Sequence, residues 1–145
     1  MKRKLLFLCT GNFYRSRFAE EYFNHLAHQK KLQWLASSKG LSNNMPNPEN
    51  PGAISIHAVK ALKKRNGSGK SLDRYLKQVD ANDFASVDKI VALCEAEHYP
   101  MIQRRFNGFL RNVTFFEIGD LPEEEPDKAM DRLAIHVEQL VKQLK

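Results

Sequence analysis

Two residues separated by five others, Cys9 and Arg15, suggest the chemistry of this chain. Gly11 lies between them and permits a tight turn with a close approach of the backbone to a ligand. A loop of this length between a strand and a helix can point successive N–H groups inward, and the helix start adds unpaired donors. The planar guanidinium of Arg15 fits two phosphate oxygens. The predicted phosphate-binding residues are Thr10, Gly11, Asn12, Phe13, Tyr14, Arg15 and Ser16.

The same positive field acts on Cys9. Helix starts and nearby cations stabilise a thiolate, which is the nucleophilic form of cysteine. A thiolate at the floor of an oxyanion cradle is the arrangement needed for attack on phosphorus with a covalent thiophosphate intermediate. One alternative is structural, because a buried cysteine that ends a strand and an arginine on a helix surface give the same spacing.

The elements that must position this loop follow from the spacing of apolar residues. Short apolar runs predict strands, at residues 4–9, 33–38, 88–94 and 113–118. Apolar residues three and four apart predict helices, at residues 16–31 with Ser16 as cap, 54–62, 95–106 and from 127 onward after a loop. Residues 40–52 are predicted as a loop and residues 72–84 as a short helix and a turn. The alternation predicts an α/β fold, an open sheet of four parallel strands with helices on both faces.

Four residues with chemistry-bearing side chains fall at the carboxyl ends of the predicted strands. They are Cys9, Ser38, Cys94 and Asp120. Ligand sites of open parallel sheets gather at that edge, so we expect these side chains to lie near one another.

Length and composition favour one folded domain over residues 1–145, with 42% hydrophobic and 28% charged residues. The longest apolar run, residues 5–9, is too short for a membrane span or a secretion signal. We therefore expect a cytoplasmic protein with reduced thiols and no membrane partner. The net charge of +6 favours a solvated basic face or steering of an anionic substrate. Aromatic residues are not interleaved with the basic ones, so no nucleic-acid partner is expected.

The chain also carries a longer pattern. Matching residues near the N-terminus are Cys9, Gly11, Asn12, Arg15, Ser16, Ala19 and Glu20. Further matches are Ser38-Lys39-Gly40, Asp83-Phe84, Asp88-Lys89-Ile90-Val91 and His98. With these residues the chain resembles the low-molecular-weight protein tyrosine phosphatases, which have the thioredoxin-coupled arsenate reductases as relatives.

The resemblance implies hydrolysis of a phosphotyrosine protein or a small aryl phosphate in two steps, without metal or cofactor. Cys9 would be the nucleophile and Arg15 the phosphate clamp. Ser16 would donate a hydrogen bond to the thiolate, and Asn12 and Ser38 would brace the loop.

The chain departs from the family pattern in its loop, and the general acid and the substrate contacts must be assigned from this sequence. Tyr14 replaces a second loop cysteine, and Arg17 replaces a proline, where it either adds charge at the pocket rim or faces solvent. Asp120 is the preferred general acid because it follows the last strand directly, with Asp127 as the alternative. Rim contacts for an aromatic group are expected from Phe13, Tyr14 and residues 43–45.

Other functions stay open. A displaced acid would leave a phosphate-binding protein with weak or no turnover. Cys94 is a possible redox partner of Cys9, as in the arsenate reductases, although their third cysteine is absent. Residues 67–71 resemble the end of a nucleotide-binding loop but lack its first glycine, and the histidines show no metal-ligand spacing.

Overall fold

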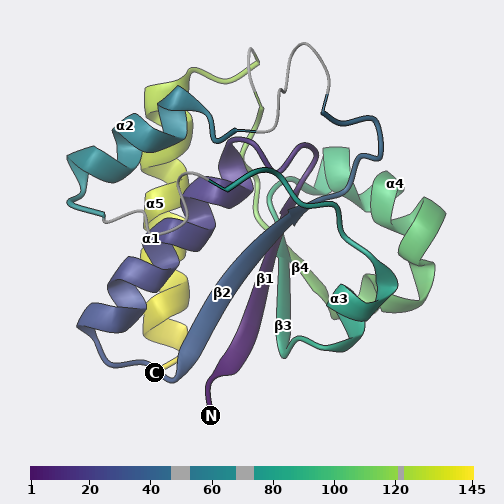
Figure 1. The fold of residues 1–145 in the computed structure, drawn as a ribbon, viewed down its shortest axis with the longest axis horizontal. Helices are drawn as coiled ribbons and strands as arrows, with labels where there is room; N and C mark the ends of the chain where they lie inside the picture. The colour runs from purple at the N-terminus through teal and green to yellow at the C-terminus, as the bar shows by residue number, and fades with distance from the viewer. Residues whose placement is uncertain (47–52, 68–73, 121–122) are drawn as a thin grey trace.

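The computed structural model of the protein describes residues 1–46, 53–67, 74–120 and 123–145 (Figure 1). The elements of these residues, in chain order, are β1 (Arg3–Cys9), α1 (Arg15–Gln29), β2 (Trp34–Gly40), α2 (Ile56–Lys64), α3 (Ala81–Ala85), β3 (Lys89–Ala92), α4 (Glu95–Phe106), the 3₁₀ helix η1 (Asn107–Asn112), β4 (Val113–Phe115) and α5 (Pro126–Gln143).

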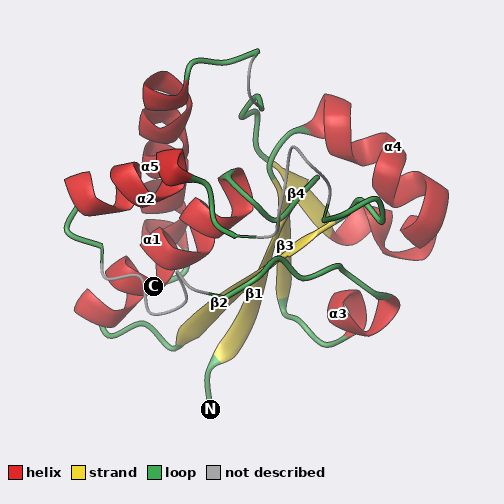
Figure 2. Ribbon diagram, turned by 45° about the horizontal axis from the view of Figure 1, so that its top comes forward, coloured by secondary structure: helices red, strands yellow, loops and turns green. Residues whose placement is uncertain are grey.

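The four strands form one sheet in the order β2-β1-β3-β4, and every neighbouring pair is parallel (Figure 2). Each crossover returns through at least one helix, as parallel pairing requires. The predicted α/β fold with a four-stranded parallel sheet is confirmed. The order places β1 in the middle of the sheet, so its carboxyl end at Cys9 lies between the ends of β2 and β3.

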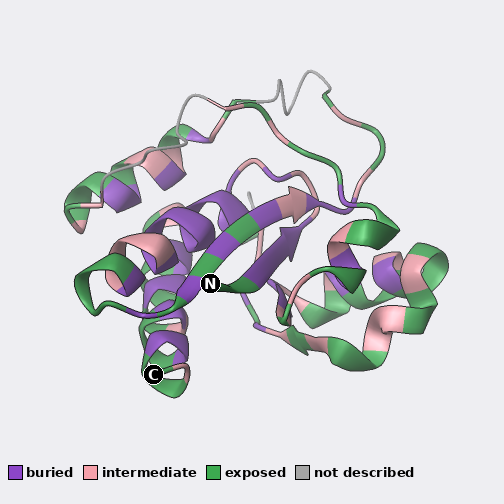
Figure 3. Ribbon diagram, turned by 60° about the horizontal axis from the view of Figure 1, so that its bottom comes forward, coloured by how far each residue is buried: buried purple, intermediate pink, exposed green. Residues whose placement is uncertain are grey.

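Strand β1 is apolar on both faces because helices cover both (Figures 1 and 3). Leu5 and Phe7 pack with α1, α2 and α5 on one side of the sheet. Leu6 and Leu8 pack on the other side with residues of α3, α4 and η1. The start of the Cys9–Arg15 loop, the predicted phosphate loop, is thus fixed by a strand that is buried on both sides.

Several predicted boundaries need correction. Strand β2 runs to Gly40, two residues beyond its predicted end, and α2 begins and ends two residues later than predicted. Helix α1 begins one residue earlier than predicted, with Tyr14 at the N-cap, so Ser16 lies inside the first turn and caps nothing. Strands β3 and β4 end before the predicted residues 94 and 118. Within 72–84, residues 72 and 73 lie outside the described residues, and helix begins only at Ala81. An Asp80–Asp83 capping box, in which each side chain accepts from the other's backbone N–H, defines that start.

None of the helices in the described residues is both long and apolar enough to cross a membrane.

Candidate active site

The loop from Cys9 to Arg15 connects the end of β1 to the start of α1. Cys9 is 2% exposed. Asn12 has a φ of 49°, a left-handed conformation that asparagine tolerates better than most residues. This residue reverses the chain, so the loop curls back before the helix begins. The strand that ends at Cys9 and the helix that starts at Arg15 are those that the sequence predicts on the two sides of the loop.

The Cys9 sulfur has one side-chain hydrogen-bond partner within the loop region. Its Sγ lies 2.9 Å from Ser16 Oγ. Ser16 Oγ already accepts a hydrogen bond from Asn12 Nδ2 at 3.0 Å, so its own hydrogen is available to the sulfur. Ser16 thus ties the sulfur at the end of β1 to the first turn of α1.

Asn12 braces the loop with its whole side chain, which is fully buried. Its Nδ2 donates to Ser16 Oγ at 3.0 Å and to Ser38 Oγ at 2.9 Å. Its Oδ1 accepts from Arg74 Nη1 at 3.1 Å and from the Lys77 N–H at 2.9 Å. Both donors and both lone pairs are therefore used, which is the condition under which a buried amide holds one conformation.

Two members of this network, Glu20 and Arg74, were not assigned a role from the sequence. Ser38 Oγ donates to Glu20 Oε1 at 2.6 Å and accepts from Arg74 Nη2 at 2.9 Å. Arg74 Nη2 also pairs with Glu20 Oε1 at 2.8 Å. Glu20 matches the family pattern. Arg74 lies in a stretch of the sequence rich in lysine and arginine, and no sequence signal distinguishes it from the others.

Gly40, at the end of β2, explains part of the Ser38-Lys39-Gly40 match. A Cβ on Gly40 would lie 3.0 Å from the Thr10 carbonyl oxygen and 3.1 Å from the Asn12 nitrogen. Only a residue without a side chain leaves the phosphate loop in its place there.

Arg15 is 1% exposed, and four of its five N–H donors face acceptors among the described residues. Nη1 donates to Glu97 Oε1 at 3.1 Å and to the Ile118 carbonyl at 2.9 Å. Nη2 donates to Glu97 Oε2 at 2.6 Å and lies 3.2 Å from Asp120 Oδ2. Nε is buried and has no hydrogen-bond partner among the described residues. Burial lowers the pKa of Arg15, but the Glu97 hydrogen bond and the charges around it raise it overall.

Glu97 and His98 are the largest addition that the structure makes to the predicted site. The Glu97 carboxylate accepts from the Thr10 hydroxyl, and its Oε2 lies 3.1 Å from His98 Nε2. Burial alone would raise the pKa of Glu97, but hydrogen bonds from His98 and Arg15 hold it well below its usual value. His98 matched the family pattern without an assigned role, and Glu97 carried no sequence signal.

His98 is fully buried at the start of α4. The Cys94 N–H donates to His98 Nδ1 at 3.1 Å, so the neutral ring carries its hydrogen on Nε2, facing Glu97. Burial lowers the pKa of His98, which favours this neutral form.

The two candidate acids lie in different surroundings. Asp120 is next to Arg15, and its side chain is 39% exposed. Asp127 lies exposed in the first turn of α5, where an acid favours the helix dipole. The structure thus brings Asp120, and not Asp127, to the phosphate clamp. Leu121 and Pro122, which follow Asp120, lie outside the described residues.

Two expectations about the rim are wrong. Tyr14 is 2% exposed, with its ring edge-on to His57 at 6.2 Å, because the N-cap position turns it into the core; burial raises the pKa of Tyr14 to about 12. Arg17 neither faces solvent nor lies at a rim, since it is fully buried and donates to the Arg74 carbonyl at 3.0 Å. Phe13, within the loop, is half-buried, so its predicted rim contact stays a prediction.

Cys94 is half-buried at the N-cap of α4, and both cysteines are free thiols. Its pairing with Cys9 therefore stays a prediction. Among the described residues, no group of three or more His, Cys, Asp and Glu side chains is placed to hold a metal. The segment 67–71, which resembles the end of a nucleotide-binding loop, lies outside the described residues except for Gly67.

The family model described as "Low molecular weight phosphotyrosine protein phosphatase" matches residues 4–117. Three solved structures are similar over nearly the whole chain. The low molecular weight protein tyrosine phosphatase from T. tengcongensis has 21% identity, a TM-score of 0.79 and coverage of 99% of this chain and 100% of that one. SP-PTP, the corresponding enzyme from Streptococcus pyogenes, has 16% identity, a TM-score of 0.83 and coverage of 99% and 93%. The YwlE arginine phosphatase from Geobacillus stearothermophilus has 22% identity, a TM-score of 0.75 and coverage of 98% and 92%.

At these identities the structural likeness shows the fold alone. No protein of curated function matches the chain in sequence. The family model covers most of the chain, including the Cys9–Arg15 loop. The chain therefore belongs to the low-molecular-weight phosphotyrosine protein phosphatase family, whose members are cysteine-dependent enzymes.

Proposed function

We propose that the protein hydrolyses the phosphomonoester of a tyrosine or another aryl alcohol through a cysteinyl-phosphate intermediate. The observation that carries this proposal is the Arg15 guanidinium, which is buried beside the Cys9 loop with its Nε–H unpartnered among the described residues. A buried donor without a partner is costly unless a ligand takes it. A phosphate bound above the Cys9 sulfur supplies that acceptor.

In the first step the Cys9 thiolate attacks phosphorus, and the bond from phosphorus to the aryl oxygen breaks. Asp120, entering as the neutral acid, gives its proton to the leaving oxygen. The loop N–H groups and Arg15 hold the three equatorial oxygens. The products of this step are the alcohol, a phosphocysteine at Cys9 and the Asp120 carboxylate.

In the second step the Asp120 carboxylate takes a proton from water, and the resulting hydroxide attacks phosphorus. The bond from phosphorus to sulfur breaks, which returns the Cys9 thiolate and releases inorganic phosphate. Ser16 stabilises the departing sulfur through the hydrogen bond at 2.9 Å. Asp120 is then protonated again and the cycle closes.

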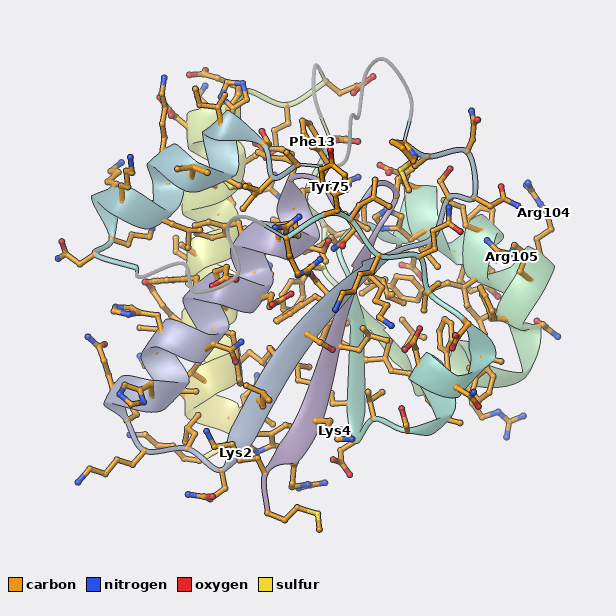
Figure 4. All side chains as sticks on the ribbon, in the orientation of Figure 1. Lys2, Lys4, Phe13, Tyr75, Arg104 and Arg105 are labelled. Carbon is orange, nitrogen blue, oxygen red and sulfur yellow. The ribbon has the colours of Figure 1, made fainter. Side chains whose placement is uncertain are left out.

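An aryl group is supported by the residues around the loop. Phe13 is half-buried, and Tyr75 is 67% exposed. Arg74 and Lys77 both hydrogen-bond to Asn12, so the segment that carries Tyr75 runs beside the loop. Figure 4 shows Phe13 and Tyr75 at the same end of the sheet. Two such rings offer an apolar wall to a substrate ring.

The free thiols also support a reducing compartment, and we propose the cytoplasm. A thiolate nucleophile remains active only where it is kept reduced.

Steady-state hydrolysis of p-nitrophenyl phosphate at mildly acidic pH with a chelator present tests the proposal. We expect turnover by the wild type and a loss of at least about 10³-fold in Cys9→Ser. Cys94→Ser is the matched control, since it removes the other free thiol, and should keep activity within about twofold. Activity that survives in Cys9→Ser contradicts the cysteinyl-phosphate route.

The substrate class is tested with phosphotyrosine and phosphoarginine peptides of the same sequence, because one of the similar structures is an arginine phosphatase. We expect the larger kcat/KM for phosphotyrosine. A preference for phosphoarginine would support phosphatase activity but contradict the proposed substrate class. Phosphate binding without hydrolysis of either peptide leaves only a phosphate-binding protein.

A further inference from the structure

We propose that Glu97 is a positioning residue for this reaction, which holds the outer edge of the Arg15 guanidinium so that the inner edge stays open to phosphate. The inference rests on the proposed phosphate site at Cys9 and Arg15. It adds a side chain from helix α4, outside the phosphate loop, to the machinery that makes that site work.

The two edges of the guanidinium have different partners. Nη1 and Nη2 form the outer edge, and Glu97 binds both, at 3.1 and 2.6 Å. The remaining Nη1 hydrogen goes to the Ile118 carbonyl at 2.9 Å. The inner edge consists of Nε–H and the second Nη2 hydrogen, the pair of donors that a phosphate can accept side by side. Nε has no partner among the described residues, and Asp120 lies 3.2 Å from Nη2.

Glu97 is anchored too firmly to be the group that phosphate displaces. Besides both Arg15 contacts, its carboxylate accepts from the Thr10 hydroxyl and faces His98 Nε2 at 3.1 Å. Asp120 is the better candidate for displacement, since its contact to Nη2 is longer and its side chain is more exposed, 39% against 31%. An incoming phosphate oxygen then takes the Nη2 hydrogen that points to Asp120 and releases that carboxyl toward the leaving oxygen.

The anchoring also connects three parts of the site. Glu97 lies in the first turn of α4, so the helix fixes its backbone. Thr10 belongs to the phosphate loop, and Arg15 is the clamp. One carboxylate thus sets the distance between the loop and the guanidinium. Without the charge of Glu97, the Arg15 guanidinium gains rotational freedom. The conformational entropy of this side chain must then be lost when phosphate binds.

A different role for the same contact has the opposite consequence. If Glu97 occupied the place of the phosphate, it would compete with the substrate for Arg15, and its removal would strengthen phosphate binding. If it positions Arg15, its removal weakens phosphate binding. The sign of one measured change separates the two roles.

The experiment measures the binding of inorganic phosphate by calorimetry, together with kcat and KM for p-nitrophenyl phosphate. The variants are Glu97→Gln, which keeps the shape without the charge, and Glu97→Asp, which keeps the charge on a shorter side chain. Glu95→Gln is the matched control, because Glu95 lies exposed in the same helical turn and loses the same charge.

We expect Glu97→Gln to weaken phosphate binding about tenfold or more and to lower kcat/KM about 10- to 100-fold, as lost alignment does. Glu97→Asp should recover part of both losses, which a general loss of stability would not, and Glu95→Gln should match the wild type. The melting temperature identifies a variant that fails to fold. Should Glu97→Gln do so, Glu97→Asp against Glu95→Asp repeats the comparison.

Tighter or unchanged phosphate binding in a folded Glu97→Gln overturns the positioning role and leaves the proposed function intact. A wild type that binds no phosphate overturns the proposed function, and this inference with it.

Discussion

On its β2 side the phosphate loop contacts a closed network of buried amide, hydroxyl and ionic groups, whereas on its α4 side it contacts two carboxylates and an imidazole. The β2 side centres on Asn12, whose four hydrogen-bonding positions are all used. The α4 side centres on Arg15, with one donor unpartnered among the described residues and one shared with the partly exposed Asp120.

This difference separates two tasks. The β2 side fixes the shape of the backbone, including the left-handed Asn12, and nothing in it needs to change during a reaction. The α4 side directs charge, and part of it must change in the proposed reaction, because the phosphate would take the Nη2 donor that now faces Asp120. A site that binds a dianion and then passes a proton needs both a rigid part and an adjustable part.

The largest effect is expected from breaking the rigid side with Asn12→Ala. The change forces alanine into a left-handed conformation, at a cost of about 1–2 kcal/mol. It also removes the Asn12 acceptor of the Lys77 N–H and one hydrogen bond each from Ser38 and Arg74. We expect a loss in kcat/KM of about 10³-fold or more, with weaker phosphate binding and a free energy of unfolding lower by about 2–4 kcal/mol. Kinetics, calorimetry and chemical denaturation measure these three quantities.

Asn24→Ala is the control for that experiment. Asn24 also ties α1 to β2, through two hydrogen bonds with the Ala36 backbone at 2.8 and 3.0 Å, but it takes no part in the loop network. It should lower stability and leave kcat/KM near the wild-type value. Equal losses of activity in the two variants would show that the network supports the fold in general and not the loop.

A smaller and more selective effect is expected from the adjustable side with Asp120→Asn. Removing the proton donor should lower kcat about 10²- to 10³-fold for substrates with poor leaving groups and less for p-nitrophenyl phosphate. Phosphate binding should stay the same or become tighter, because a charge that competes for Arg15 Nη2 is removed. Asp127→Asn is the control, because Asp127 lies at an exposed position in the first turn of α5. If Asp127→Asn shows the selective loss instead, the acid has been assigned to the wrong residue.

The contrast between the two sides also explains what the sequence predicted. The fold followed from local patterns, since β1 is apolar from Leu5 to its end and α4 was predicted with its observed ends. The β2 side was partly predicted, because Asn12 and Ser38 stand in a family pattern. Arg74 was missed, because its role depends on where an irregular segment crosses the loop, and no periodicity encodes that crossing.

The α4 side was the harder one to predict, for a physical reason. Glu97 is one acid among several at a helix start, where acids favour the helix dipole whatever else they do. Its role depends on a partner 82 residues away. The predictions for Arg17 and Tyr14 failed for the reverse reason. Their polar groups suggest exposure, whereas the first turn of α1 and its N-cap place both side chains in the interior.

The smallest effect concerns the pH dependence of stability on the α4 side. The pKa of His98 is lowered in the folded state, so below its ordinary value near 6.5 the unfolded chain binds a proton that the folded one does not. Stability therefore falls as pH falls from about 7.5 to 5.5, by up to about 1.4 kcal/mol per pH unit for this one proton. The lowered pKa of Glu97 acts in the same direction, but only as pH falls below about 4.5, so the two contributions separate.

We expect His98→Gln, which keeps a donor toward Glu97, to flatten the slope between pH 7.5 and 5.5 in chemical denaturation. His28→Gln, at an exposed histidine in the last turn of α1, should keep the wild-type slope. Identical slopes in all three proteins would mean that His98 takes up its proton in the folded state. It would then place a second cation beside Glu97 and Arg15, and the adjustable side would carry one charge more than the geometry of the neutral ring implies.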